Sequence, residues 1–249
     1  MKLSAYAGAA SELSRGLLGN AALALWGGID PTREDEFNDW YTHEHIPERI
    51  AIPGFLRARR YVADHEDPRL AGWRYFTLYE VNTSEVLHSD AYIAALNSPT
   101  AGTLRSLPLF KNISRMGCTV TYSVARGEGG SLFVAELGPS PGRESEFRAW
   151  LTTRVAEDLL MRSGSLAVHL CELDDSATRL GIQVESYRDV RTGTGRWLWL
   201  AEGSWTEPKQ AVDTCLDTLS DRAAHGGDEQ LAAGMFRLLG SATAAKIIV

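Results

Sequence analysis

The chain has 249 residues, of which 44% are hydrophobic, 23% charged and 9% aromatic. This composition excludes a disordered or collagen-like chain, and the length suits one large domain or two small ones with a substantial core. The formal net charge of −7 disfavours nonspecific binding to a phosphate backbone, so we expect no nucleic-acid partner.

The three cysteines, Cys118, Cys171 and Cys215, are far apart in the sequence and form no CxxC pair. This spacing argues against a disulfide framework or a structural zinc site and favours a reducing compartment. Residues 1–19 lack the continuous apolar core of a secretory signal, and no stretch approaches the length of a membrane span. We therefore expect a cytoplasmic protein with no membrane partner, in which residues 1–19 form an N-terminal extension.

The first half of the chain contains four predicted strands and two predicted helices. Strands are expected near residues 20–28, 54–63, 72–81 and 111–124, and helices near 32–46 and 83–97. The first helix has a clear start, because Asp30-Pro31-Thr32 combines an N-cap residue with a proline in the first turn. Pro47 bounds this helix, and Pro53-Gly54 supplies the turn into the next strand.

The second half repeats this order of elements. Strands are expected near residues 131–137, 165–174, 195–205 and 234–241, and helices near 142–161 and 207–222. Residues 33–42 and 143–152 agree at six of ten positions, which indicates a duplication with an offset of 110 residues. We therefore predict two repeats, at residues 20–124 and 131–249, joined by a Gly-rich linker at residues 125–130.

The order strand-helix-strand-strand-helix-strand is that of a ferredoxin-like unit, whose antiparallel four-stranded sheet carries both helices on one face. On the predicted strand 72–81, both faces are apolar, since Tyr75 and Tyr79 alternate with Phe76 and Leu78. A sheet with two apolar faces needs a second covering layer. We therefore predict an α+β fold in which two tandem ferredoxin-like repeats pack sheet to sheet, as a pseudo-dimer within one chain.

The segment from Phe37 to Phe55, with its run Trp-Tyr-Thr-His-Glu-His-Ile-Pro-Glu-Arg, and its continuation to Tyr61 resemble the EthD-like branch of the dimeric α+β barrel superfamily. The resemblance covers residues 20–122, including a closing segment at 99–112, and is faint in the second half. It implies two ferredoxin-like units that pair through their sheets. The superfamily includes cofactor-free monooxygenases, polyketide cyclases, lactone isomerases and haem-degrading enzymes, so the resemblance alone selects no reaction.

The strongest candidate for acid/base chemistry lies at the end of the first helix. At about 100° per residue, Glu44 falls under the apolar stripe, His45 flanks it and His43 faces solvent. A buried carboxylate beside a histidine can form a general acid/base site, and the family resemblance points to the same histidine. We predict His45 and Glu44 as catalytic residues, with the carboxylate orienting the imidazole. The structural alternative is that both side chains cap the helix or pair with Arg49 or Arg57.

The site is expected once per chain, because the aligned positions of the second half are Thr153, Arg154 and Val155.

Whichever face of strand 54–63 is buried, at least one arginine is buried with it. That arginine needs an acceptor, either a structural carboxylate such as Glu80 or an anionic ligand. The predicted substrate-binding residues are Trp40, Tyr41, Arg57, Arg59, Tyr75 and Tyr79. Aromatic stripes of this kind also occur as ordinary core.

The sequence has no P-loop, dinucleotide fingerprint or Gly-x-Ser-x-Gly elbow, and we expect no cofactor. We also expect no metal site, because two histidines at positions 43 and 45 lie about 200° apart on a helix.

The leading hypothesis is an enzyme acting on an apolar or aromatic anionic metabolite, as an isomerase, cyclase, dehydratase or cofactor-free monooxygenase. The alternatives are a non-catalytic small-molecule binding protein and a haem-binding or haem-degrading protein with His45, His65 or His169 as axial ligand. Further association of the pseudo-dimer is left open.

Overall fold

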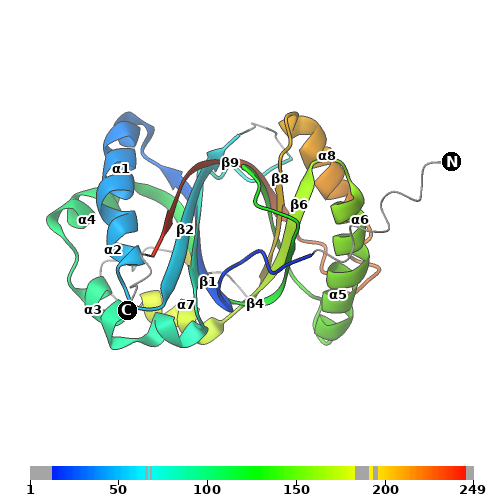
Figure 1. Ribbon diagram of the computed structural model, residues 1–249, viewed down its shortest axis with the longest axis horizontal. Coiled ribbons are helices and arrows are strands. Elements are labelled where there is room, and N and C mark those ends of the chain that lie inside the picture. The colour runs from blue at the N-terminus through cyan, green and yellow to red at the C-terminus, as the bar shows by residue number, and fades with distance from the viewer. Residues whose placement is uncertain (1–12, 65–66, 68, 183–190, 193–195, 245–249) are drawn as a thin grey trace.

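Alternating apolar side chains in both halves of the chain form strands that close into one antiparallel barrel of eight strands (Figure 1). The computed structural model describes residues 13–64, 67, 69–182, 191–192 and 196–244. The barrel strands are β1 (Ala21–Ile29), β2 (Phe55–Ala63), β3 (Tyr75–Val81), β4 (Phe110–Ala125), β5 (Ser131–Leu137), β6 (Ser165–Leu173), β8 (Trp197–Gly203) and β9 (Ala232–Thr243). A two-residue strand, β7 (Arg191–Thr192), adds to β4 in parallel.

Two long strands join the halves of the barrel. The strand order is β1–β3–β2–β9–β5–β8–β6–β4, and β4 closes the barrel by pairing with β1. β4 pairs with β1 through residues 110–119 and with β6 through residues 118–125. Similarly, β9 pairs with β5 through residues 232–237 and with β2 through residues 236–243. The predicted α+β class is confirmed, with the difference that the two predicted sheets form one continuous barrel.

The helices lie outside the barrel in two groups. They are α1 (Glu34–Trp40), α2 (Ile46–Ile50), α3 (Asp90–Asn97), α4 (Ala101–Ser106), α5 (Glu144–Trp150), α6 (Ala156–Met161), α7 (Asp175–Ile182) and α8 (Pro208–Thr218). Figure 1 shows α1 to α4 on one side of the barrel and α5, α6 and α8 on the opposite side. A π-helical turn at Tyr41–His45 joins α1 to α2, and another at Leu151–Val155 joins α5 to α6. Each turn inserts an extra residue relative to a regular α-helix.

All of the predicted strands form, whereas the helical segments differ in detail. Residues 83–97, predicted as one helix, divide at Ser89, whose hydroxyl accepts a hydrogen bond from the backbone N–H of Tyr92 at 3.2 Å and so caps α3. A 3-10 helix at Ser84–His88 precedes this cap. The sequence prediction contains neither α4 nor α7. The latter is held against β4 by Thr178, whose hydroxyl contacts the backbone N and O of Gly117 at 2.9 and 3.1 Å.

Side-chain alternation gives the barrel wall two buried faces. On β3, Tyr75 and Tyr79 face the helices, whereas Phe76 and Leu78 point into the barrel. Apolar core therefore fills the barrel interior and the space beneath each helix group. The prediction that both faces of this strand are covered is confirmed. Among the described residues, no helix has the length and apolar character needed to cross a bilayer.

Candidate functional site

Strand β2 carries three buried arginines, and its alternation places them on opposite faces of the sheet. Arg57 and Arg59 point into the barrel, where both donate hydrogen bonds to Glu80. Arg60 points outward beneath α1, with its guanidinium carbon 4.2 Å from the centroid of the Tyr41 ring. Because successive side chains of a strand point to opposite faces, β2 contributes arginines to two polar groups that lie on opposite sides of the sheet.

Each face of the sheet has its own group of polar and aromatic side chains. The His45 site lies beneath the helices and comprises Trp40, Tyr41, His45, Arg49, Arg60 and Tyr79. The barrel network lies inside the barrel and comprises Arg57, Arg59, Glu80, Ser123, His169 and Glu202. The structure thus brings three predicted binding residues together with His45, and a fourth, Tyr75, borders them. It places the remaining two, Arg57 and Arg59, on the other face of the sheet.

His45 is buried in an aromatic environment. It ends the π-helical turn after α1 and is 5% exposed. Its ring centroid lies 4.7 Å from that of Trp40, 4.9 Å from that of Tyr41 and 6.4 Å from that of Tyr79. The hydroxyl of Tyr79 donates a hydrogen bond to that of Tyr41 at 3.2 Å. The Nδ1 atom of His45 has no hydrogen-bond partner among the described residues.

The electrostatic environment keeps His45 neutral. Burial lowers its pKa well below the usual value of 6.5, and the positive charges of Arg49 and Arg60 lower it further. A neutral imidazole with an unpaired ring nitrogen is able to accept a proton from a bound molecule at neutral pH. The arrangement is therefore chemically suited to a general base.

Glu44 lies against α4, away from the imidazole that it was predicted to orient. Its carboxylate accepts a hydrogen bond from the hydroxyl of Thr100, the N-cap of α4. It also packs on Gly102, where an added Cβ would lie 2.2 Å from a carboxylate oxygen. Because the π-helical turn inserts a residue, His45 occupies the inner face that regular helical spacing predicts for Glu44. His43 faces solvent as expected and pairs with Asp39 at 3.0 Å.

Arg49 and Arg60 are site residues that the sequence reasoning missed. Both are buried, and both act electrostatically on His45. Arg49 was considered only as a structural partner of the helix end. The sequence shows that Arg60 lies on the opposite face of the strand from Arg57 and Arg59. Only the fold shows which of these faces contacts the aromatic residues.

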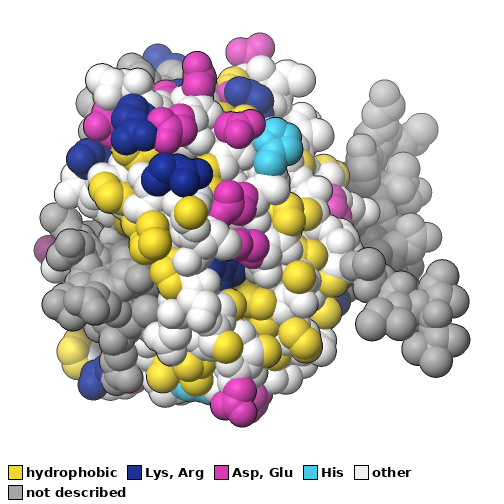
Figure 2. Space-filling model, turned by 90° about the vertical axis from the view of Figure 1, so that its left-hand side faces the viewer, with side chains coloured by type: hydrophobic (Ala, Val, Ile, Leu, Met, Phe, Trp, Pro, Cys, Tyr) yellow, Lys and Arg dark blue, Asp and Glu magenta, His cyan; other side chains and the backbone are white. Residues whose placement is uncertain are grey.

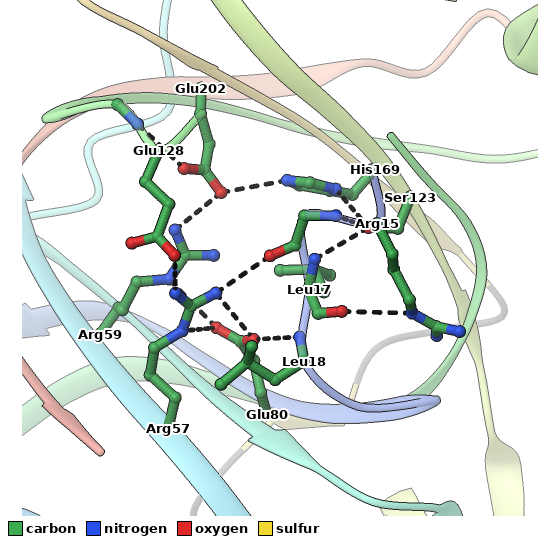
Figure 3. Close-up of polar contacts among 12 residues, drawn as sticks. Arg15, Leu17, Leu18, Arg57, Arg59, Glu80, Ser123, Glu128, His169 and Glu202 are labelled. Atoms are coloured by element: carbon green, nitrogen blue, oxygen red, sulfur yellow. Dashed lines mark hydrogen bonds and ion pairs between the residues drawn. The ribbon is translucent and has the colours of Figure 1, made fainter. Parts of the chain in front are cut away.

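The barrel network is a chain of buried ion pairs (Figure 3). Arg57 donates from Nε and Nη2 to Glu80 at 2.7 and 2.9 Å, and Arg59 donates from Nε to the same carboxylate at 3.1 Å. Arg59 also donates from Nη1 to Glu202 at 2.7 Å, and Glu202 contacts His169 Nε2 at 3.0 Å. The predicted alternative of Glu80 as a structural acceptor for a buried arginine is confirmed. Sequence reasoning did not find the contributions of His169 and Glu202, because they come from the distant strands β6 and β8.

The chain before β1 enters the barrel next to this network, as Figure 3 shows for the backbone of Leu17 and Leu18. The N–H of Leu18 donates to Glu80 at 2.8 Å, and the N–H of Leu17 donates to the hydroxyl of Ser123 at 2.9 Å. Position 16 must be small, because an added Cβ on Gly16 would lie 2.7 Å from the His169 ring. Residues 13–19, predicted as part of an extension, thus contribute to the barrel core.

The two adjacent leucines of this segment allow a matched comparison. Leu17 is 1% exposed and Leu18 is 52% exposed. Leu17→Ala is expected to lower the free energy of unfolding by about 2 to 5 kcal/mol, the usual cost of truncating a buried leucine. Leu18→Ala is expected to change it by less than about 0.5 kcal/mol. Urea unfolding measures both values, and equal effects would contradict the observed burial.

The barrel network also predicts a loss of stability in acid. Burial alone would raise the pKa of Glu202, but the hydrogen bonds and charges of His169 and Arg59 lower it from 4.5 to about 2. The folded state therefore binds fewer protons, so this stabilisation is complete above pH 4.5 and disappears as the pH falls to about 2. We expect a loss of roughly 3 kcal/mol across this range. In Glu202→Gln the unfolding free energy, measured in urea at a series of pH values, should fall less steeply.

The histidines proposed as haem ligands differ in their surroundings. His169 does not fit an axial ligand, because Nδ1 contacts Ser123 and Nε2 contacts Glu202, both at 3.0 Å. His65 lies outside the described residues. His45 has an unpaired Nδ1, but its ring packs closely on Trp40 and Tyr41. Within the described ranges, no three His, Cys, Asp or Glu side chains come together as a metal site would require.

A surface cavity of about 800 Å³ lies apart from both groups. It is lined by residues at the ends of β2 and β9 and before β3, namely Ala63, Asp64, Asp67, Leu70, Ala71, Gly72, Trp73, Arg74, Gly234 and Met235. It contains neither His45 nor Glu44. Figure 2 shows the face formed by α1 to α4, where charged side chains gather at the top of the view and hydrophobic ones lie mainly below.

No protein family model matches the sequence, and no curated protein matches it. The crystal structure of an anthrone oxidase-like protein is similar, with a TM-score of 0.63 at 9% identity over 94% of this chain and 97% of that chain. The structure of a candidate monooxygenase from Fusobacterium nucleatum is also similar, with a TM-score of 0.55 at 10% identity over 91% of this chain and 96% of that chain. The structure of a mutant chlorite dismutase from Candidatus Nitrospira defluvii has a TM-score of 0.50 at 7% identity over 88% of this chain and 91% of that chain. At such identity these likenesses show a shared α+β barrel fold alone.

Proposed function

We propose that this protein is an enzyme that uses His45 as a general base on an apolar or aromatic anionic metabolite. The observation that carries the proposal is a buried imidazole with an unpaired Nδ1 and a depressed pKa, surrounded by aromatic rings. A residue kept for packing alone would gain nothing from an unpaired polar atom in the core. A non-catalytic binding protein would not need a buried neutral base, so the enzymatic function is favoured.

The reaction begins with proton transfer from the substrate to His45. The proton from an acidic C–H or O–H bond goes to the imidazole, and the electron pair stays on the substrate as an enolate or phenolate. The nearby guanidinium groups of Arg49 and Arg60 favour this negative charge. Return of the proton to a different atom gives an isomerase, and its transfer to a departing hydroxyl group releases water and gives a dehydratase. Attack of the carbanion on a carbonyl, whose oxygen then takes the proton, gives a cyclase. Addition of the carbanion to O₂ gives a hydroperoxide that loses water to leave a carbonyl, with the substrate itself as the reductant, and this gives a cofactor-free monooxygenase.

The proposal includes the evolutionary origin of the chain. We propose a tandem duplication within the EthD-like branch, with repeats at 20–124 and 131–249 and a linker at 125–130. The equal offset of the two π-helical turns, Tyr41–His45 and Leu151–Val155, supports it. The names of the similar structures, an anthrone oxidase-like protein and a candidate monooxygenase, are compatible with the oxygenase option. A cytoplasmic location is proposed as well, supported by three buried free thiols.

The experiment that tests the function starts from the purified protein. Native mass spectrometry against a metabolite extract identifies a molecule that binds, and proton NMR in D₂O then follows that molecule with and without the enzyme. Catalysed exchange of an acidic proton, or conversion to a product, supports acid/base catalysis. A bound molecule that neither exchanges nor reacts supports the binding protein instead, and a Soret band on titration with haem supports the haem hypothesis.

A further inference from the structure

We propose that Arg49 and Arg60 form an anion-binding pair in the His45 site, which takes a planar oxyanion, the carboxylate or enolate of an aromatic or conjugated molecule. This inference deepens the proposed function, since it names the group that the site recognises. It also moves the anion-binding role from Arg57 and Arg59, the residues predicted from the sequence, to two arginines on the other face of the sheet.

The first support is that both guanidinium groups are buried and have nitrogen atoms without a hydrogen-bond partner. Arg49 is 4% exposed, and its Nε and Nη1 atoms have no hydrogen-bond partner. Arg60 is 3% exposed; its Nε has no partner, and its Nη2 donates to the neutral amide oxygen of Asn38 at 2.7 Å. Among the residues that the structure describes, neither arginine forms an ion pair. Glu48 acts on Arg49 and Glu34 acts on Arg60 electrostatically, but neither carboxylate forms an ion pair with its arginine. Buried charges with unpartnered nitrogen atoms are unfavourable, so this arrangement favours a directly bound anion.

Other arginines of the sheet and of the second half have more complete sets of partners. Arg57 and Arg59 share the carboxylates of Glu80 and Glu202, although Nη2 of Arg59 lacks a partner. In the second half, Arg148 lies 5.3 Å from the centroid of the Trp197 ring and pairs with a carboxylate, that of Glu172, at 2.6 Å. Arg115 on β4 is also buried without a carboxylate partner in the described part of the chain, but it donates hydrogen bonds to the backbone oxygens of Ala177 and Thr178 and to the hydroxyl of Tyr92. Arg49 and Arg60 differ from Arg115 in having guanidinium nitrogens with no partner among the described residues.

The second support is that the site fixes the position of Arg60. Its guanidinium carbon lies 4.2 Å from the centroid of Tyr41 and 4.4 Å from that of Tyr75, so the two rings hold the planar group. A preorganised guanidinium matches the geometry of a planar oxyanion.

The surroundings determine the rest of the ligand. The rings of Trp40, Tyr41 and Tyr79 give an aromatic environment next to the two charges. A molecule held by its oxyanion would place its conjugated body against these rings, within reach of His45. The same positive charges keep the imidazole unprotonated, and a bound oxyanion offsets them, which makes transfer of a proton to His45 more favourable in the complex.

The test uses benzoate and its neutral analogue benzamide as probes, with affinity measured by isothermal titration calorimetry. Wild-type protein is expected to bind benzoate at least tenfold more tightly than benzamide. Arg49→Met and Arg60→Met should each weaken benzoate binding at least tenfold and leave benzamide binding unchanged. Arg60→Lys, which keeps the charge, should retain more affinity for benzoate than Arg60→Met, and circular dichroism checks that each variant is folded.

Two further variants separate this inference from the proposed function. Arg148→Met removes the ion-paired arginine of the second half and should bind benzoate as the wild type does. His43→Gln, which changes the exposed histidine of the same turn, should also keep benzoate binding. Affinity that depends on both arginines supports the inference even if no reaction is found. Equal affinity of the wild type for benzoate and benzamide overturns it, and so does undiminished benzoate binding by both Met variants.

Discussion

Glu80→Gln is expected to lower the free energy of unfolding by about 3 to 5 kcal/mol. Glu80 is fully buried and accepts hydrogen bonds from Arg57, Arg59 and the backbone N–H of Leu18. Without its charge, two buried guanidinium groups depend on Glu202 and on Glu128, which is 62% exposed. Urea unfolding of the variant and the wild type measures the difference.

Glu128→Gln is the control, because it removes a solvent-exposed partner of the same arginine, Arg57. It is expected to change the unfolding free energy by less than about 1 kcal/mol. The double variant Arg57→Met/Glu80→Met should lose less stability than the sum of its single variants, because it leaves no unpaired charge from this pair. A loss below about 1 kcal/mol in Glu80→Gln would mean that the network carries little of the stability.

His45→Gln is expected to reduce kcat/KM for the identified substrate by about a hundred- to ten-thousand-fold, the usual contribution of a positioned acid or base. Glutamine fills a similar volume but cannot take up the proton. The folding free energy should change little, because Nδ1 of His45 makes no hydrogen bond that the variant would lose. Steady-state kinetics and urea unfolding on the same preparation measure the two quantities.

His43→Gln is the matched control, since this histidine lies on the same turn with its side chain 74% exposed. Its activity should stay within about twofold of the wild type, in keeping with the small effects of surface changes. The pH profile adds a second criterion. Because the pKa of His45 lies well below 6.5, kcat/KM should hold steady down to pH 6.5 and fall only in more acidic solution. A fall centred at pH 6.5 would indicate an exposed histidine as the base.

Local patterns were enough to predict the strands and the two buried faces of the sheet. Alternation has a period of two residues, so Tyr75 and Phe76 had to point to opposite sides wherever the strand was placed. A buried guanidinium needs an acceptor, and the sequence offered either a carboxylate such as Glu80 or an anionic ligand. For Arg57 and Arg59 the first alternative holds, since Glu80 lies on the neighbouring strand.

The position of the catalytic candidates within the helix could not be predicted in the same way. A regular period of 3.6 residues places Glu44 inward, whereas the π-helical turn places His45 there. The spacing of the buried residues contains a signal for this turn, because Phe37, Tyr41 and Ile46 are four and then five residues apart. Such a signal is weak until the sheet contacts of the helix are known.

Contacts between distant segments were beyond sequence reasoning. Nothing local indicates that His169 and Glu202 meet Arg59, since these residues approach one another only when the barrel closes. The structure explains why glycines flank Leu17 and Leu18. A Cβ atom at Gly16 would collide with the ring of His169, and one at Gly19 would collide with the backbone of Val81. That reason becomes visible only once residues 13–19 are seen inside the barrel.

Closure of the barrel by β4 and β9 has a consequence for how copies of the chain could associate. In the described part of the structure, each of the eight barrel strands has a paired neighbour on both sides for at least part of its length. The longer rows without a second barrel strand lie on β4 at residues 110–117, where β7 and α7 cover part of the row, and on β9 at residues 238–243. Unpaired rows of backbone N–H and C=O groups are the usual template for edge-to-edge association. Strand addition by a second copy is therefore confined to these two segments, and any other oligomer forms through the outer helices and loops.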